Sequence, residues 1–166
     1  MSVDIITADG KPYGVPRPGE KVVWSDGREF IGAYCDAGTL SPATIALGAP
    51  VLIGYDTGDE GNDPIVIGAS TSTVPKQVGV PLETISVAGW YWFQTKGDCQ
   101  ALVNGAAPVA LGDFLELITA TARFVIDHAT VRSVYSAAVA REAYAVSATA
   151  LKDVYLIGDP VQIAGS

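Results

Sequence analysis

The chain has 166 residues and a mass of 17.2 kDa, which is enough for one domain with a hydrophobic core. Ten Lys and Arg against eighteen Asp and Glu give a net charge of −8, which argues against a nucleic-acid-binding surface. Charged residues make up 17% of the chain and hydrophobic residues 49%, the opposite of the balance in disordered chains. A surface this poor in charge predicts that a partner protein, or further copies of the chain, cover part of it.

The sequence gives no indication of a membrane segment or of a zinc site. It has no run of eighteen uncharged apolar residues, and residues 1–11 lack the basic and apolar regions of a signal peptide. Cys35 and Cys99 have neither CxxC spacing nor a nearby histidine, so they predict no zinc site. Two buried, reduced thiols are the simpler interpretation. A Cys35–Cys99 disulfide is the alternative for a protein that ends up outside a cell.

Glycines and prolines interrupt the first thirty residues at short intervals. They are Gly10, Pro12, Gly14, Pro16, Pro18 and Gly19. This spacing predicts an extended N-terminal arm of residues 1–30 and a body of residues 31–166. Proline holds φ near the polyproline value, so such an arm would reach a partner surface already partly ordered. The candidate partner-binding residues of the arm are Tyr13, Val15, Pro16, Arg17 and Pro18. A flexible terminus without a binding role is the alternative.

From residue 21 onward, short β-like runs alternate with Gly, Pro, Asp and Asn. The runs expected to form strands are residues 21–24, 29–34, 50–55, 64–69, 90–95, 100–103, 114–118 and 154–157. Strands of this length and spacing predict an all-β fold, a small β-barrel or a β-sandwich.

Two pairs of segments within the chain resemble each other. Residues 46–52 (Ala-Leu-Gly-Ala-Pro-Val-Leu) resemble residues 110–116 (Ala-Leu-Gly-Asp-Phe-Leu-Glu), and residues 80–85 resemble residues 139–144. Both similarities favour hairpins of one kind. Chance is the alternative in a chain so rich in Ala, Val, Gly and Leu.

Residues 131–151 carry two conflicting signals. Seven alanines raise the helix propensity of this stretch. Its alternating pattern and its similarity to the proline-containing residues 80–85 favour an extended chain. We expect strand, turn and strand here, with one helix as the alternative.

The residues capable of chemistry form no familiar catalytic pattern. The sequence contains no GxSxG, P-loop, GxGxxG or HExxH motif. His128, the single histidine, follows Asp127, but nothing in the sequence around it suggests a Ser-His-Asp triad with an oxyanion hole. The acidic, glycine-rich residues 56–63 lack the order of an EF-hand, so a solvated loop is expected and a calcium site is the alternative. We expect no enzymatic activity and no cofactor.

The densest aromatic run, Gly-Trp-Tyr-Trp-Phe-Gln-Thr, occupies residues 89–95. In a strand, Trp90 and Trp92 share one face and Tyr91 and Phe93 share the other. A central strand packed on both faces is the simpler interpretation. The alternative is an aromatic platform for a sugar or a protein partner, which makes Trp90 and Trp92 candidate contact residues.

A set of strand-and-turn segments carries a resemblance to a known family. The segments are Val-Gly-Val-Pro-Leu-Glu-Thr-Ile at 78–85, Gly-Trp-Tyr-Trp-Phe-Gln-Thr-Lys-Gly at 89–97, Ala-Leu-Val-Asn-Gly at 101–105 and Val-Ala-Leu-Gly-Asp-Phe-Leu-Glu-Leu at 109–117. In this order they resemble the head decoration (cement) proteins of tailed bacteriophages, and the similarity continues at residues 139–144 and 154–158. None of the matched segments is catalytic.

The resemblance implies a small β-rich virion protein on the outer surface of the capsid. Such proteins assemble as oligomers and connect neighbouring major capsid proteins, so we expect the major capsid protein as partner and a dimer or trimer of the chain itself. The alternative is a carbohydrate-binding or host-attachment module of a virion, in which Trp90, Tyr91 and Trp92 would make the contacts.

Overall fold

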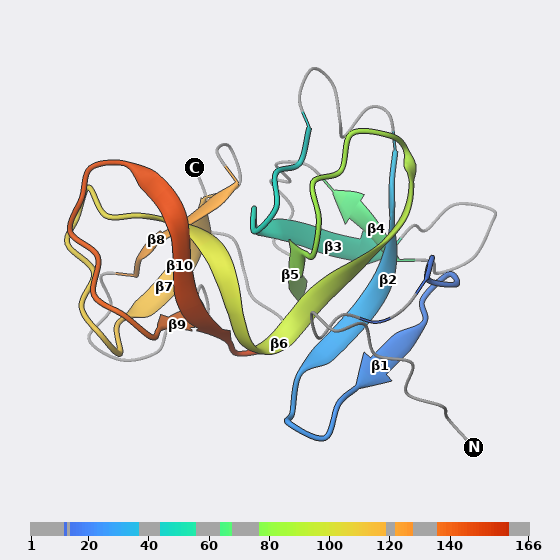
Figure 1. The fold of residues 1–166 in the computed structure, drawn as a ribbon, viewed down its shortest axis with the longest axis horizontal. Coiled ribbons are helices and arrows are strands. Elements are labelled where there is room, and N and C mark those ends of the chain that lie inside the picture. Colours follow the sequence, from blue (N-terminus) through green and yellow to red (C-terminus); the bar gives the residue numbers. More distant parts are fainter. Residues whose placement is uncertain are drawn as a thin grey trace.

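A computed structural model describes residue 12 and residues 14–36, 44–55, 64–67, 77–118, 122–127 and 136–159. Ten strands and no helix lie within these residues (Figure 1), which confirms the all-β prediction. No helix that could span a membrane occurs among them either. The strands are β1 (Lys21–Val23), β2 (Glu29–Cys35), β3 (Val51–Tyr55), β4 (Pro64–Ile67), β5 (Gln77–Pro81), β6 (Gly89–Asn104), β7 (Phe114–Ile118), β8 (Arg123–Ile126), β9 (Ser136–Ala140) and β10 (Thr149–Leu156).

Five strands close into a first barrel. The order around the ring is β2, β4, β3, β5 and β6, and β6 pairs again with β2. Successive side chains of a strand point to opposite faces, so every second residue of these strands faces the interior. The buried residues of this interior are Ile31, Ala33, Cys35, Ile53, Val66, Ile85 and Phe93.

A second barrel follows the same plan with β6, β8, β7, β9 and β10, and β10 pairs again with β6. Phe124 and Leu115, both fully buried, belong to its core. Leu52 and Val80, from β3 and β5, are part of the same hydrophobic cluster. The first barrel therefore packs against the second through apolar side chains.

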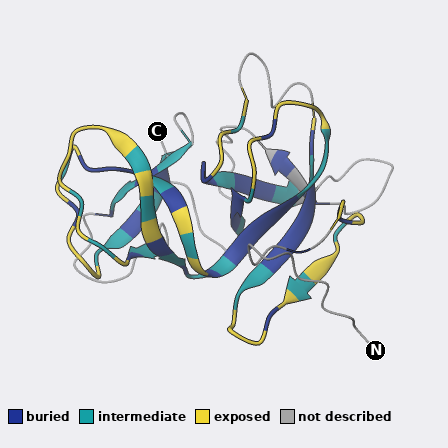
Figure 2. Ribbon diagram, viewed as in Figure 1, coloured by how far each residue is buried: buried dark blue, intermediate teal, exposed yellow. Residues whose placement is uncertain are grey.

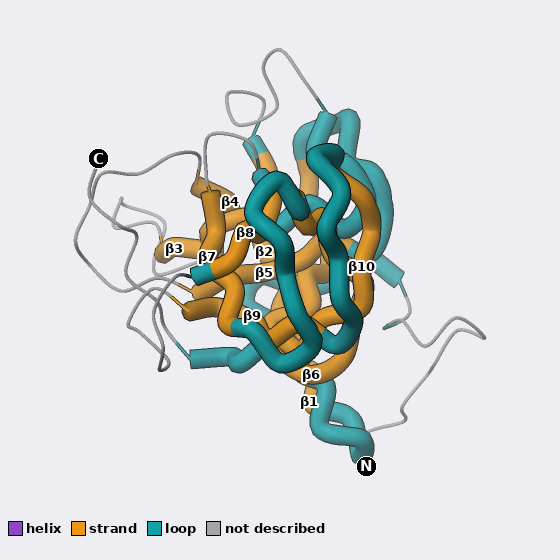
Figure 3. The backbone as a smooth tube through the Cα atoms, turned by 90° about the vertical axis from the view of Figure 1, so that its left-hand side faces the viewer, coloured by secondary structure: helices purple, strands orange, loops and turns teal. Residues whose placement is uncertain are grey.

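Strand β6 belongs to both barrels. Residues 89–96 pair with β2, and residues 97–104 pair with β10. The strand bends at Gly97, whose φ of +89° suits glycine, and the Gln94 side-chain amide donates to the carbonyls of Lys96 and Asp98 at 3.0 and 2.9 Å. Because one 16-residue strand runs through both rings, their relative position is fixed by its backbone (Figures 1 and 3).

The two sequence similarities correspond to equivalent positions in the two barrels. An isolated antiparallel bridge joins Ile45 to Ile85 in the first barrel, and another joins Val109 to Tyr144 in the second. The single parallel pairings match as well, β2 with β4 and β6 with β8. The chain thus contains an internal structural repeat, with β2 to the first half of β6 matching the second half of β6 to β10.

Each of the eight runs expected to form strands overlaps a strand in its described residues, and the two runs 90–95 and 100–103 merge into β6. Residues 68 and 69 of the run 64–69 lie outside the described part. Strands β5 and β8 are not predicted by the sequence patterns. Within residues 136–151 the structure has β9, a turn and the start of β10, so strand, turn and strand is confirmed there and the helix alternative is wrong. Residues 131–135 lie outside the described part.

The described part of the predicted arm lies on the first barrel. Residues 21–30 form β1, a tight turn and the beginning of β2, closed by a hydrogen bond from the Trp24 amide to the Arg28 carbonyl at 2.9 Å. Trp24 and Phe30 are 9% and 1% exposed, with ring centroids 4.9 Å apart. Residues 21–30, which the sequence analysis assigns to the arm, are therefore paired with β2 and packed on the first barrel.

Candidate functional site

The first half of β6 is packed on both faces, as its aromatic pattern predicts. Phe93 points into the first barrel and is fully buried. Tyr91 lies on the same face, partly buried, and its hydroxyl donates to the Val87 carbonyl at 2.9 Å. The opposite face, which carries Trp90 and Trp92, lies outside the barrel and needs a different cover.

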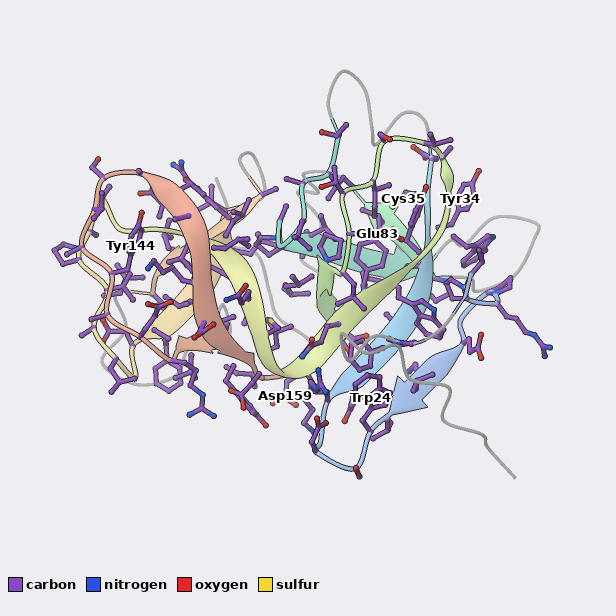
Figure 4. All side chains as sticks on the ribbon, viewed as in Figure 1. Trp24, Tyr34, Cys35, Glu83, Tyr144 and Asp159 are labelled. Atoms are coloured by element: carbon purple, nitrogen blue, oxygen red, sulfur yellow. The ribbon has the colours of Figure 1, made fainter. Side chains whose placement is uncertain are left out.

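The chain itself covers Trp92. The indole ring is 8% exposed and forms a cluster with Trp24 and Phe30. Its Nε1–H donates to the Gly14 carbonyl at 3.0 Å, a contact across 78 positions of sequence. Trp92 therefore makes its contacts within the chain. Figure 4 labels Trp24, one member of this cluster, near the lower end of β2.

Segment 14–20 lies across β2 because Gly32 leaves room for it. A Cβ at position 32 would overlap the Pro16 ring and would lie 2.8 Å from the Arg17 carbonyl oxygen. The Gly32 amide donates to the Glu20 carbonyl at 2.9 Å, and the Glu20 carboxylate accepts from the Arg17 amide at 2.9 Å. The segment is thus held by backbone hydrogen bonds as well as by apolar contact.

The seven candidate partner-binding residues differ in how far they are buried. Pro16 and Trp92 are buried, and Trp90 is half-buried. Val15, Arg17 and Pro18 are exposed, Val15 with 79% of its surface. Tyr13 lies outside the described residues. The structure thus brings the predicted arm and the aromatic strand together, against each other, and leaves three arm residues on the surface.

Trp90 stacks on Tyr34 of β2, with ring centroids 5.5 Å apart and planes tilted by 55°. Both rings are half-buried. Figure 4 shows Tyr34 at the upper end of β2, on the side away from the second barrel. Of the three residues that the sugar-platform alternative requires, Trp90 and Tyr91 are half-buried and Trp92 is buried.

Both cysteines are free thiols, as the simpler of the two interpretations expects, but only Cys35 is buried and Cys99 is partly buried. Burial raises the pKa of Cys35 to about 12 and also raises that of Cys99 to about 12, with nearby aspartates adding to the effect. A thiol with such a pKa is protonated at neutral pH and is a poor nucleophile. Cys35 belongs to the hydrophobic cluster of the first barrel, and Cys99 packs against that of the second.

The polar groups show little that could support catalysis or metal binding. No group of three metal-ligating side chains occurs in the part of the chain that the structure describes. Asp127 is buried and accepts a hydrogen bond from the Ser136 hydroxyl at 2.7 Å. His128 and the acidic residues 56–63 lie outside the described residues, so their candidate roles stay predictions.

Two surface ribbons are a feature that the sequence analysis does not assign. Ribbon 1 is residues 44–48 beside residues 82–88, and ribbon 2 is residues 108–112 beside residues 141–148. Each carries two exposed apolar side chains, and Figure 2 shows long exposed stretches along both. The available sequence signal was the pair of internal similarities, which cover parts of both ribbons.

No protein-family model matches the chain, and no curated protein matches it. Among solved structures, the chain is similar to the N base of head fiber gp8.5 of bacteriophage phi29. The match covers 81% of this chain and 98% of that chain, with a TM-score of 0.47 and 12% sequence identity. A likeness at this level does not establish a family for the chain.

Proposed function

We propose that this chain is a structural protein of a bacteriophage head, a decoration protein that binds the major capsid protein lattice on the outer surface of the capsid and stabilises the shell. The sequence resemblance to decoration proteins supports this. Its segments 78–85, 89–97 and 109–117 fall on β5, on the first half of β6 and on β7, together with parts of both ribbons. The resemblance therefore includes the elements that join the two barrels.

The observation that carries the proposal is the shared strand. Two similar barrels on one continuous strand form a rigid body with two ends. Such a body can contact two neighbouring proteins at once, and the second contact then forms at high effective concentration. A shell is strengthened when many copies each connect adjacent subunits. This role assigns no catalytic step to the chain.

The phage head fiber protein belongs to the same broad class, but at a TM-score of 0.47 the proposal does not rest on that likeness. A glycan-binding module is the competing function. It would depend on Trp90, Tyr91 and Trp92, and Trp92 is 8% exposed with its N–H already bonded to the Gly14 carbonyl. Trp90 and Tyr91 are half-buried, and the Tyr91 hydroxyl is bonded to the Val87 carbonyl, so the competing function is left with two partly covered rings.

The test uses heads of the parent phage that lack this protein. Purified full-length chain is mixed with these heads, and the mixture is analysed by co-sedimentation and electron microscopy. The expected result is saturable binding, with added density at repeated positions on the outer surface. Absence of binding to heads, together with saccharide binding that Trp90→Ala abolishes, would replace the proposal with the glycan-binding function.

A further inference from the structure

Exposed large apolar side chains recur at equivalent positions of the two barrels. In the described part of the chain they are Val15, Val23, Leu47, Val87, Leu111, Val146 and Leu151. Four of these seven lie on the two ribbons. Single exposed apolar residues are common on protein surfaces, so the repetition, rather than the exposure, is what requires an explanation.

The equivalence follows from the isolated bridges. Leu47 and Leu111 each lie two residues after a bridge residue, Ile45 in the first barrel and Val109 in the second. Each leucine also stands between an alanine and a glycine of positive φ, +77° at one turn and +90° at the other.

The valines follow the same rule on the partner segments. Val87 lies two residues after Ile85, and Val146 lies two residues after Tyr144. Their exposed fractions are 66% and 56%, and those of Leu47 and Leu111 are 44% and 69%. The two ribbons therefore present the same pair of residue types in the same arrangement.

The hydrogen bonds at these positions are made by the backbone, while 44–69% of the surface of each residue stays exposed. The Val87 carbonyl accepts from the Tyr91 hydroxyl at 2.9 Å, and the Val146 carbonyl accepts from the Ala148 amide at 2.7 Å. The Leu47 amide donates to the Thr84 hydroxyl at 3.2 Å. Polar side chains would serve these backbone contacts equally well. These hydrogen bonds therefore do not account for the repeated leucine and valine at the two ribbons.

We propose that ribbons 1 and 2 are two like docking surfaces, which bind the same apolar site on two adjacent subunits of one homo-oligomeric protein array. This rests on the proposed function, in which the array is the major capsid protein lattice. Two like surfaces on one chain match two like sites, and an array of identical subunits supplies such sites. Figure 1 shows the ribbons projecting from different sides of the molecule, one from each barrel.

A like charge on ribbon 1 disfavours a second copy as its occupant. Glu83 is exposed on ribbon 1, so two copies that met through this ribbon would bring two carboxylates together. The dimer or trimer expected from the sequence would form through other surfaces, which leaves the ribbons open to a different protein. Because β6 holds the two barrels together, the spacing of the ribbons is fixed and selects sites at one separation.

The test compares four full-length proteins on heads that lack this chain. Leu47→Ser with Val87→Ser alters ribbon 1, and Leu111→Ser with Val146→Ser alters ribbon 2. Val23→Ser is the matched control, since Val23 is 64% exposed and lies on β1, away from both ribbons. Each ribbon variant should bind about 100-fold or more weakly than wild type, because one of two linked contacts is lost. The control should bind like wild type.

The outcomes separate the inference from the proposed function. If either ribbon variant binds heads as tightly as wild type does, the inference is overturned and the proposed function stays intact. Absence of wild-type binding to heads would overturn the proposed function. A wild-type oligomer that ribbon variants dissociate, measured by sedimentation, would identify a second copy as the occupant and overturn the inference. If a serine variant fails to fold by circular dichroism, the alanine variant of the same pair is measured in its place.

Discussion

Replacement of Trp92 by alanine tests whether segment 14–24 is part of the folded body. The ring is 8% exposed, and a buried tryptophan removes on the order of 150 Å² more apolar surface from water than alanine does. At about 25 cal/mol per Å², the loss is about 4 kcal/mol, within the 3–5 kcal/mol typical of such replacements. Because small domains are stable by about 5–15 kcal/mol, the urea midpoint of Trp92→Ala should fall sharply.

Two further variants divide this effect into its parts. Trp92→Phe keeps most of the apolar contact with Trp24 and Phe30 but removes the hydrogen bond to Gly14, so it should cost about 1–2 kcal/mol. Trp90→Ala removes a half-buried ring and should cost less than Trp92→Ala. Urea denaturation followed by circular dichroism measures all three. A free energy of unfolding for Trp92→Ala within about 0.5 kcal/mol of wild type would refute the idea that the chain covers this ring.

The strands of this fold are largely predictable from sequence because their signals are local. Alternating apolar residues and turn residues between them place all eight expected runs on strands. The sequence patterns do not predict β5, which contains Gly79 and ends at Pro81, both unfavourable in an isolated strand pattern. Nor do they predict the four-residue strand β8. Their positions depend on pairing with β3 and β7 more than on their own residues.

The shared strand could not be predicted, because its two halves look like separate strands. The sequence Lys96-Gly97-Asp98 resembles a turn, and only the pairing of each half with a different partner, β2 or β10, shows that the strand continues. The contact of residues 14–20 with β2 could not be predicted for a related reason. Proline and glycine predict an extended chain but not which surface it lies on, and that surface is set by Gly32, distant in sequence.

The candidate site was predictable in part. The sequence identified the two-sided packing of the aromatic strand and the internal similarities. It could not show that the chain itself covers Trp92, because the contact with Gly14 joins residues 78 positions apart. Nor could it show that Leu47 and Leu111 are exposed at matching turns, since exposure depends on the closed barrels around them. The proposal that the two ribbons are docking surfaces therefore required the tertiary structure as well as the sequence similarities.

Three further predictions concern assembly, the arm and the buried thiol. Light scattering at micromolar concentration should give two or three times the chain mass of 17.2 kDa, and a mass of one chain would exclude the expected dimer or trimer. Gly32→Ala should lower the free energy of unfolding by about 1–3 kcal/mol, because the added methyl group overlaps Pro16. The control is Gly89→Ala on the paired strand, whose added methyl group meets nothing closer than 3.5 Å and should change stability by less than about 0.5 kcal/mol. Equal urea midpoints for the two variants would contradict this prediction. Burial raises the pKa of Cys35 from 9.0 to about 12, so above pH 9 the unfolded chain loses this proton before the folded one does. Stability should then fall as the pH rises from 9 toward 12, by up to about 1.4 kcal/mol per pH unit for this thiol, and Cys35→Ala should show a shallower decline. Identical slopes in the two proteins over that range would show that the thiol of Cys35 is not protected from ionisation in the folded state.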